Sequence, residues 1–179
     1  MYEYTLIRSA RRSIAMSVKD GKLIVRAPLT ATREEIDDVL KHHGQWIAKH
    51  LSLQEKARDI EPLTPEELKA LADRAVRELP ELIDRYAGLL HVTVNKITIR
   101  AQHTKWGSCT SAGNLSLNVL IMLMPPKVRD AVIVHELCHR KEMNHSKRFY
   151  DLLYSVCPDY EESRKWLNEN GAALMARLK

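Results

Sequence analysis

The segment Val132–His145 reads VIVHELCHRKEMNH, and it decides how the rest of the chain is interpreted. His135 and His139 are four residues apart, so on an α-helix their side chains share one face, where two imidazoles can bind a single metal ion. Glu136 lies directly beside them. The flanking residues are apolar nearly all round the helix, which is typical of a helix buried through the middle of a domain. The segment therefore predicts a buried, metal-binding helix.

Chance rarely produces this motif. With 8 His and 14 Glu among 179 residues, a random sequence of this composition contains His-Glu-x-x-His roughly 0.03 times. Two unrelated histidines on a core helix are therefore the weaker interpretation.

A catalytic zinc usually has three protein ligands and one open position, so a third ligand is needed. Glu142 shares the helical face but stands seven residues past His135, about 10 Å along the axis, which is too far for one ion to bridge comfortably. His145 lies between Asn144 and Ser146, which both favour the end of one helix and the start of another. The chain can therefore turn there and bring His145 back towards His135 and His139. We favour His145 and keep Glu161 and Glu162, on a later helix, as alternatives.

Further motifs lie along most of the chain. They are Trp106–Cys109, Leu117 and Asn118 before Pro125, His145–Tyr150, and, nearer the start, Arg11–Ile14, Asp20–Pro28 and Trp46–Ile47. Together with the His135–His139 motif they resemble the YgjP-like zinc metallopeptidase family. One departure is Lys105, which precedes Trp106 where the family commonly has an arginine.

The resemblance implies a function and a site. It implies one Zn²⁺ per chain, bound by His135, His139 and His145, and peptide-bond hydrolysis with Glu136 as the catalytic base. It also implies that an extended peptide or protein substrate pairs with an edge strand near the metal, within residues 106–118.

Three residues are our candidates for substrate contacts: Trp106, Asn118 and Tyr150. Trp106 is a candidate wall of the substrate cleft, although a tryptophan packed under a loop would give the same sequence pattern. The glycine after it suggests either a positive φ or a close approach of the backbone. Tyr150, with Tyr154 and His103, is also a candidate donor to the oxyanion of the reaction.

Two other functions stay open. A metal-dependent nucleotide (UTP-type) pyrophosphatase could use the same metal and carboxylate, but the chain has no glycine-rich phosphate loop. A DNA-associated, SprT-like protease would be expected to carry a basic tail or a zinc ribbon, and neither is present. A purely structural zinc site is less favoured, because such sites usually have four protein ligands.

Composition narrows the class of protein. Three cysteines without Cys-x-x-Cys spacing argue against a disulfide framework and a thiolate zinc site. The net charge of +5 is spread evenly, which favours a generic basic surface over a dedicated nucleic-acid groove. No secretory signal is apparent, and the longest apolar run, Val119–Met124, is too short to span a membrane. We therefore expect a cytoplasmic protein without a membrane partner; its oligomeric state is unknown from the sequence.

The expected fold class is α+β and zincin-like: a small, mostly antiparallel sheet packed on the metal helix. We expect residues 1–60 to form an N-terminal strand-and-helix unit and residues 61–179 the metallopeptidase domain, or both to form one continuous domain. The first unit should contain an antiparallel meander with a turn at residues 19–22, then a helix that begins with a Thr32–Glu35 capping box.

The charged residues 54–63 read as a linker before a helix that starts at Thr64. We expect Pro80 to kink or split that helix and Gly88 to end it. After the metal helix, a last helix is expected to span residues 160–168 and to close at Gly171.

Overall fold

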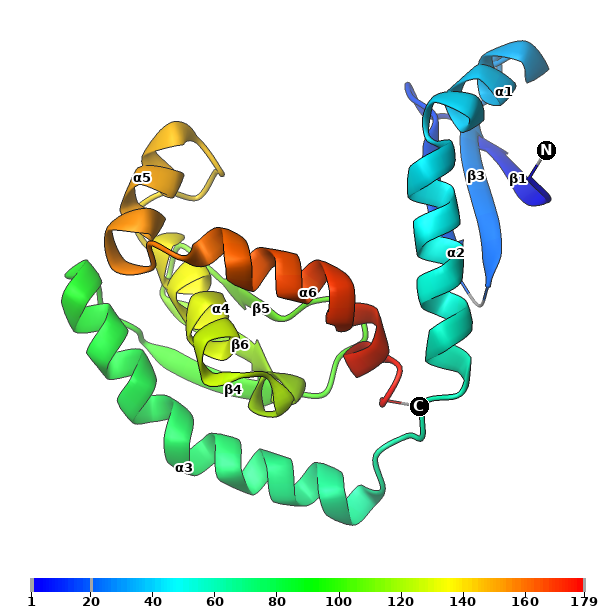
Figure 1. Ribbon diagram of the computed structural model, residues 1–179. Coiled ribbons are helices and arrows are strands. Elements are labelled where there is room, and N and C mark those ends of the chain that lie inside the picture. Colours follow the sequence, from blue (N-terminus) through cyan, green and yellow to red (C-terminus); the bar gives the residue numbers. More distant parts are fainter. Residues whose placement is uncertain (1, 20, 179) are drawn as a thin grey trace. The chain divides into compact units, whose positions relative to one another are not determined.

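The computed structural model describes residues 2–19 and 21–178. The chain divides into two compact units, Met1–Ile60 and Glu61–Lys179 (Figure 1). Each has its own buried apolar core. That each unit folds as a separate domain stays a prediction.

The first unit is a three-stranded sheet with two helices. Its elements are β1 (Tyr4–Ser9), β2 (Ala15–Lys19), β3 (Lys22–Pro28), α1 (Arg33–His42) and α2 (Gly44–Arg58). Alternate residues of β3, namely Leu23, Val25 and Ala27, are buried together with Ile36 of α1 and Ile47 of α2. The sheet therefore buries one face under the helices, as the alternating pattern of β3 predicts.

The expected meander is wrong in its strand order. The order is β1-β3-β2, so β3 lies between the other two, parallel to β1 and antiparallel to β2. The predicted turn does join β2 to β3, with Lys19 opposite Lys22, although Asp20 lies outside the described residues. Alternation specifies which face of a strand is buried, but it does not specify which strand becomes its neighbour.

The helical part of this unit differs from expectation at one end. The capping box of Thr32 and Glu35 is confirmed in both directions. The helix expected beyond it is interrupted at His43, and α2 continues to Arg58, into the segment expected to be a linker. Residues 54–58 read QEKAR, and all five are strong helix formers. The helix therefore continues beyond the last residue of its apolar pattern.

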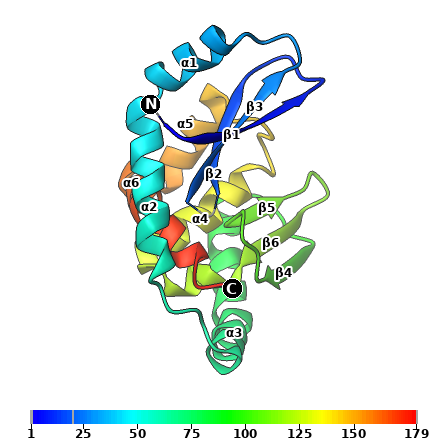
Figure 2. The same cartoon turned by 90° about the vertical axis from the view of Figure 1, so that its right-hand side faces the viewer.

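The second unit contains another three-stranded sheet and four α-helices, of which α3 and α4 contact the sheet. Its elements are α3 (Pro65–Leu90), β4 (Lys96–Arg100), β5 (Gly107–Cys109), β6 (Asn114–Asn118), the 3₁₀ helix η1 (Val119–Leu123), α4 (Pro126–Cys138), α5 (Lys147–Val156) and α6 (Tyr160–Met175). Figure 2 shows β6 between β4 and β5. Strand β6 is parallel to β4 and antiparallel to β5. The α+β class is thus confirmed, whereas each sheet is mixed rather than mostly antiparallel.

Helix α3 is continuous through Pro80, contrary to the expected kink or split. A proline inside a helix removes one hydrogen bond and costs about 3 kcal/mol. Leu79 and Ile83 on either side of Pro80 are fully buried, so packing of the apolar face offsets that cost. Gly88 does not end the helix either; His91 does, in a left-handed conformation with φ 50° and ψ 50°.

Helix α4, which carries the histidine motif, lies in the middle of the second unit (Figure 1). It contacts α3, α5, α6, η1 and the strands β5 and β6. Its buried residues are Val128, Ala131, Val132, Ile133, Val134, Glu136, Leu137 and Cys138. The prediction of a helix buried on nearly all sides is therefore confirmed.

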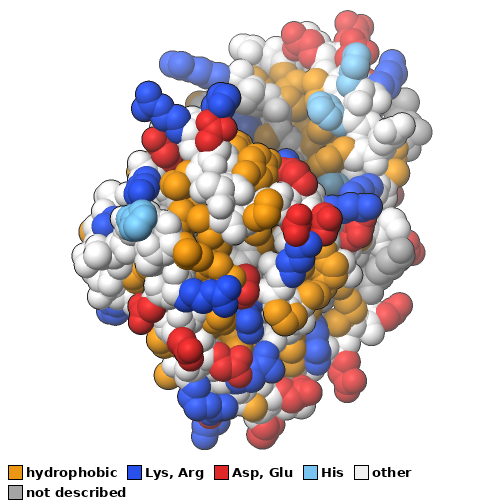
Figure 3. All heavy atoms as spheres, turned by 60° about the vertical axis from the view of Figure 1, so that its left-hand side comes forward, with side chains coloured by type: hydrophobic (Ala, Val, Ile, Leu, Met, Phe, Trp, Pro, Cys, Tyr) orange, Lys and Arg blue, Asp and Glu red, His pale blue; other side chains and the backbone are white. Residues whose placement is uncertain are grey.

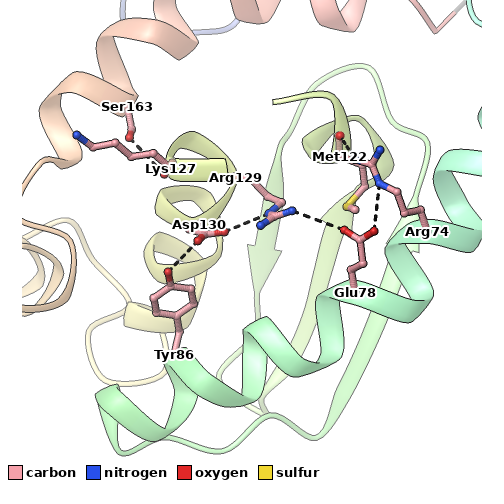
Figure 4. A network of polar contacts seen from close by, with 8 residues as sticks. All are labelled: Arg74, Glu78, Tyr86, Met122, Lys127, Arg129, Asp130 and Ser163. Carbon is pink, nitrogen blue, oxygen red and sulfur yellow. Dashed lines mark hydrogen bonds and ion pairs between the residues drawn. The ribbon is translucent and has the colours of Figure 1, made fainter. Parts of the chain in front are cut away.

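Polar groups connect α4 to the helices around it (Figure 4). Tyr86 of α3 donates a hydrogen bond of 2.9 Å to the Asp130 carboxylate, and Arg129 contacts both Asp130 and Glu78. On the opposite side, Lys127 forms ion pairs with Asp159 and with Glu162, the latter in α6. These contacts orient the start of α4, whose later turns are apolar apart from His135 and Glu136.

Charged side chains of both signs are interspersed on the face of the molecule drawn in Figure 3. No helix among the described residues is both long and apolar enough to cross a membrane.

The hydrogen bond between Tyr86 and Asp130 provides a test of this packing. The Tyr86 side chain is almost buried, and burial followed by the nearby Asp130 carboxylate raises its pKa, so the phenol stays protonated as a donor. We expect Tyr86→Phe to lower the free energy of unfolding of the second unit by about 1–2 kcal/mol. Denaturant unfolding monitored by circular dichroism measures this change.

Tyr154→Phe is the matched control. Its hydroxyl also donates to a carboxylate, that of Glu161, but the side chain is 37% exposed and water can replace the bond. We expect little change for this variant. Equal losses for the two variants would show that the contact to α4 stabilises the fold no more than an exposed hydrogen bond does.

Candidate metal centre

Three histidines converge at the C-terminal end of α4. His135 lies in the last full turn of the helix, His139 is its final cap, and His145 precedes α5. One ring nitrogen from each of the three can be chosen so that all lie within 4.8 Å of one another. Nε2 of His145 is 3.1 Å from Nε2 of His135. Among the described residues this is the one group of three or more metal-binding side chains so arranged.

The loop between α4 and α5 folds His145 back towards the helix. The backbone leaves the helical path after His139, and Ser146 caps α5 by accepting a hydrogen bond from the Phe149 amide. This is the local structure that the neighbouring Asn144 and Ser146 predict. The placement of His145 beside the other two imidazoles is therefore a consequence of a short turn between two helices.

Hydrogen bonds at the far nitrogens orient two of the rings. Nδ1 of His139 is 3.1 Å from the backbone carbonyl oxygen of Glu142, which can only accept, so this nitrogen carries the proton and Nε2 keeps a free lone pair. Nδ1 of His135 is 2.9 Å from the hydroxyl of buried Tyr160, which can accept in the same way. Such partners hold metal-binding histidines in the correct tautomer and orientation.

Phe149 forms the floor beneath the histidines. Its side chain is fully buried, and its ring centre lies 5.0, 4.8 and 4.7 Å from those of His135, His139 and His145. The ring excludes water from one side of the cluster. In the sequence Phe149 is recognisable only as one apolar position of α5, so nothing there indicates that it touches all three histidines.

Glu136 lies in close contact with the edge strand β5. A Cβ atom at Gly107 would come within 2.6 Å of Cγ of Glu136 and within 2.9 Å of its Cδ and Oε1. No side chain other than hydrogen fits at this point. Gly107 is not among the residues with positive φ, so the glycine permits a close approach of the backbone rather than an unusual conformation.

Burial changes the acid–base properties of these groups. Burial raises the pKa of Glu136 to about 7, and the positive charge of Lys105 acts in the opposite direction. Burial, with smaller contributions from His139 and His145, lowers the pKa of His135 to about 4. Burial also lowers the pKa of His139. Those two imidazoles are therefore neutral at pH 7, which is the form that binds a metal ion.

The three predicted substrate residues lie in different surroundings. Tyr150 is half-buried, with its ring centre 6.4 Å from that of His145. Trp106 is half-buried and packs against α6, where a Cβ atom at Gly171 would be 3.1 Å from its ring. Gly171 lies inside α6 and does not end the helix, contrary to expectation. Asn118 is completely buried.

The Asn118 side chain is occupied within the fold. Its amide nitrogen donates to the carbonyl oxygens of Gln102 and Lys105, and its oxygen accepts from the Leu120 amide. The side chain therefore holds the 102–105 loop against the end of β6. For this reason we propose no substrate contact for Asn118.

The alternative third ligands, Glu161 and Glu162, form contacts elsewhere. The rejected candidate Glu142 lies near His139 through its backbone carbonyl oxygen. Glu161 accepts from Tyr154 and pairs with Arg164, and Glu162 pairs with Lys127.

Sequence reasoning missed Arg140, the residue after His139. Its guanidinium donates to the backbone carbonyl oxygens of Thr93, Thr110 and Ser111. Gly113 lies in the turn between β5 and β6 with φ 82°, and a Cβ atom there would be 3.1 Å from Cζ of Arg140. Arg140 therefore ties the end of α4 to the turn after β5.

Part of the chain matches a known protein family. Residues 64–170 match the sequence profile of a family described as YgjP-like, metallopeptidase domain. No curated protein matches the chain.

Two solved structures resemble part of the chain. One is the metallopeptidase zymogen of Pyrococcus abyssi abylysin, with a TM-score of 0.46 and 19% identity over 49% of this chain and 90% of that one. The other is the metallopeptidase zymogen of Methanocaldococcus jannaschii jannalysin, with a TM-score of 0.43 and 20% identity over 50% of this chain and 96% of that one. The profile match covers more than half of the chain, and we conclude that the protein belongs to the YgjP-like family of metallopeptidase domains.

Proposed function

We propose that the protein is a zinc-dependent peptidase in which His135, His139 and His145 bind one Zn²⁺ and Glu136 is the general base. The observation that carries the proposal is the convergence of three imidazoles beside a buried carboxylate that binds none of them. Three imidazole nitrogens fit a catalytic zinc site, which keeps one position open. When bound, zinc supplies a Lewis acid that polarises the scissile carbonyl and acidifies water.

The chain's own residues supply the rest of the chemistry. Glu136, held against Gly107, takes a proton from the attacking water and later passes it to the leaving amine. Its pKa of about 7 in the protein without metal shows that burial makes this carboxylate a stronger base than an exposed one. The positive charge of Lys105 acts against this increase in the pKa of Glu136.

The edge strand for the substrate is β5. The expected range, residues 106–118, contains two strands, and β6 is the central one with Leu115 and Leu117 buried. Strand β5 pairs with β6 on one side only, and it contacts α4. An extended peptide added to β5 would lie beside Glu136, with its side chains alternating between the two faces. Tyr150, near His145, would border it.

We expect one zinc per chain in protein purified without a polyhistidine tag, measured by elemental analysis. His145→Ala should lower that content markedly, because two imidazoles and water bind zinc less tightly than three. Glu161→Ala and Glu162→Ala are the controls and should retain the metal. If either control variant lost its zinc while His145→Ala retained it, the proposed set of ligands would be wrong.

Glu136→Gln separates catalysis from metal binding. The amide has the size of the carboxylate but cannot take a proton, so zinc content and melting temperature should stay near wild type. Peptide hydrolysis should fall by roughly 10²–10⁴. Casein and a panel of nucleoside triphosphates should both be assayed. Loss of triphosphate hydrolysis in the absence of any casein cleavage would replace the peptidase with a pyrophosphatase.

Gly107→Ala tests the contact between β5 and Glu136. The new methyl group would displace the carboxylate, so turnover should fall by at least about tenfold while zinc stays bound. Gly88→Ala is the matched control, since no atom lies within 4 Å of its added Cβ, and it should stabilise α3 by up to about 1 kcal/mol. Unchanged turnover in Gly107→Ala would remove β5 from the catalytic site.

A further inference from the structure

The sheet of the second unit has a polar face that the peptidase chemistry does not use. Leu115 and Leu117 of β6 are buried, and Gly107 of β5 faces α4 through Glu136. Because side chains alternate along a strand, Ser116 and Ser108 point to the opposite face. We call this the outer sheet face and define it by the polar residues that line a cavity of about 530 Å³ there: Lys96, Thr98, Arg100, Gln102, Thr104, Lys105, Ser108, Thr110, Asn114 and Ser116.

Strand register places three hydroxyl groups in a row across this face. Ser116 is opposite Thr98 of β4 on one side and opposite Ser108 of β5 on the other. Neighbouring strands are about 4.8 Å apart, so the row spans about 10 Å.

Positive charges flank the row, and negative ones are absent from the lining. Lys96 and Arg100 stand two residues before and after Thr98 on the same face of β4, about 13 Å apart along the strand. Both are exposed, and neither takes part in any ion pair found among the described residues. Lys105 adds a third cation at the edge of the cavity. The lining contains no Asp or Glu.

Two polar atoms at this face have no hydrogen-bond partner within the described part of the chain. They are Oγ of Ser116 and Nε2 of Gln102, both shielded from solvent. Each can donate, and a buried donor without an acceptor costs about 1–3 kcal/mol. Rotation of these side chains towards the cavity would let a ligand oxygen accept from them.

We propose that the outer sheet face binds the phosphate backbone of duplex DNA. Lysine, arginine, serine, threonine and side-chain amides are the groups that contact phosphate oxygens in such complexes. A protein partner is a poorer fit, since the centre of a protein interface is usually apolar and Leu115 is the sole apolar residue of the lining. The lining has no aromatic ring for base stacking, which disfavours a single strand and predicts binding without sequence preference.

The proposal does not depend on zinc or on peptide hydrolysis. It also departs from the expectation drawn from composition, in which the even spread of charge favoured a generic basic surface. No cluster of basic residues marks Lys96, Arg100 and Lys105 in the sequence. Strand pairing and the loop before β5 bring them to one face.

The test uses a short fluorescein-labelled DNA duplex of mixed sequence and the full-length protein, with binding followed by fluorescence anisotropy between about 50 and 200 mM salt. We expect the double variant Lys96→Gln/Arg100→Gln to bind at least about tenfold more weakly at the lowest salt. The slope of log affinity against log salt should become shallower by about 1.8, because each phosphate contact contributes about 0.9.

The matched control is Arg77→Gln/Lys165→Gln, which removes two exposed charges from α3 and α6, outside the outer sheet face. It should keep affinity within about twofold and leave the slope unchanged. Equal weakening in both double variants would show that net charge alone attracts DNA and would overturn the proposal.

Ser116→Ala tests whether the hydroxyl groups contribute to binding in addition to the positive charges. Loss of a neutral donor should weaken binding by about 2- to 10-fold without changing the salt slope. Circular dichroism confirms that each variant is folded.

Three further results would overturn the proposal. They are the absence of duplex binding by wild type at the lowest salt, tighter binding of a matched single strand, and displacement of the duplex by polyglutamate of equal total charge. The last would assign the face to acidic peptides instead.

Discussion

The contact between Glu136 of α4 and Gly107 of β5 is the constraint on which the site depends. Helix and strand approach so closely there that a methyl group would overlap the carboxylate. This contact fixes the position of the proposed base relative to the free edge of the sheet. It also explains why so short a strand as β5 matters: three residues suffice to hold the backbone against α4.

The polar side chains of α4 differ in whether they have a hydrogen-bond partner. The Tyr160 hydroxyl and the Glu142 carbonyl oxygen form hydrogen bonds with Nδ1 of His135 and of His139. The Asp130 carboxylate accepts hydrogen bonds from Tyr86 and Arg129. Glu136 has no such partner among the hydrogen bonds of the described residues, and burial raises its pKa. Glu136 is thus the acid of α4 whose carboxylate makes no hydrogen bond within the described part of the chain, and it is the one proposed for proton transfer.

The two faces of the β4-β6-β5 sheet have opposite characters. Hydrophobic packing on α3 and α4 requires apolar side chains on one face, while alternation sends the remaining residues outward. Those residues carry hydroxyl groups, amides and positive charges, and none of the lining residues is an Asp or Glu. The proposed peptidase centre and the outer sheet face therefore share one scaffold, and Lys105 is close to both.

The sequence by itself determined the local elements: the buried helix of the His135–His139 motif, the Thr32 capping box, the start of a helix at Thr64, and the turn that starts a new helix after His145. These depend on residues a few positions apart, so periodicity and capping reveal them. Only the tertiary structure decided strand order, the continuity of α3 through Pro80, the buried position of Asn118, and the roles of Phe149, Tyr160 and Arg140. Each of those depends on partners distant in the chain, whose pairing is settled by the packing of the whole unit.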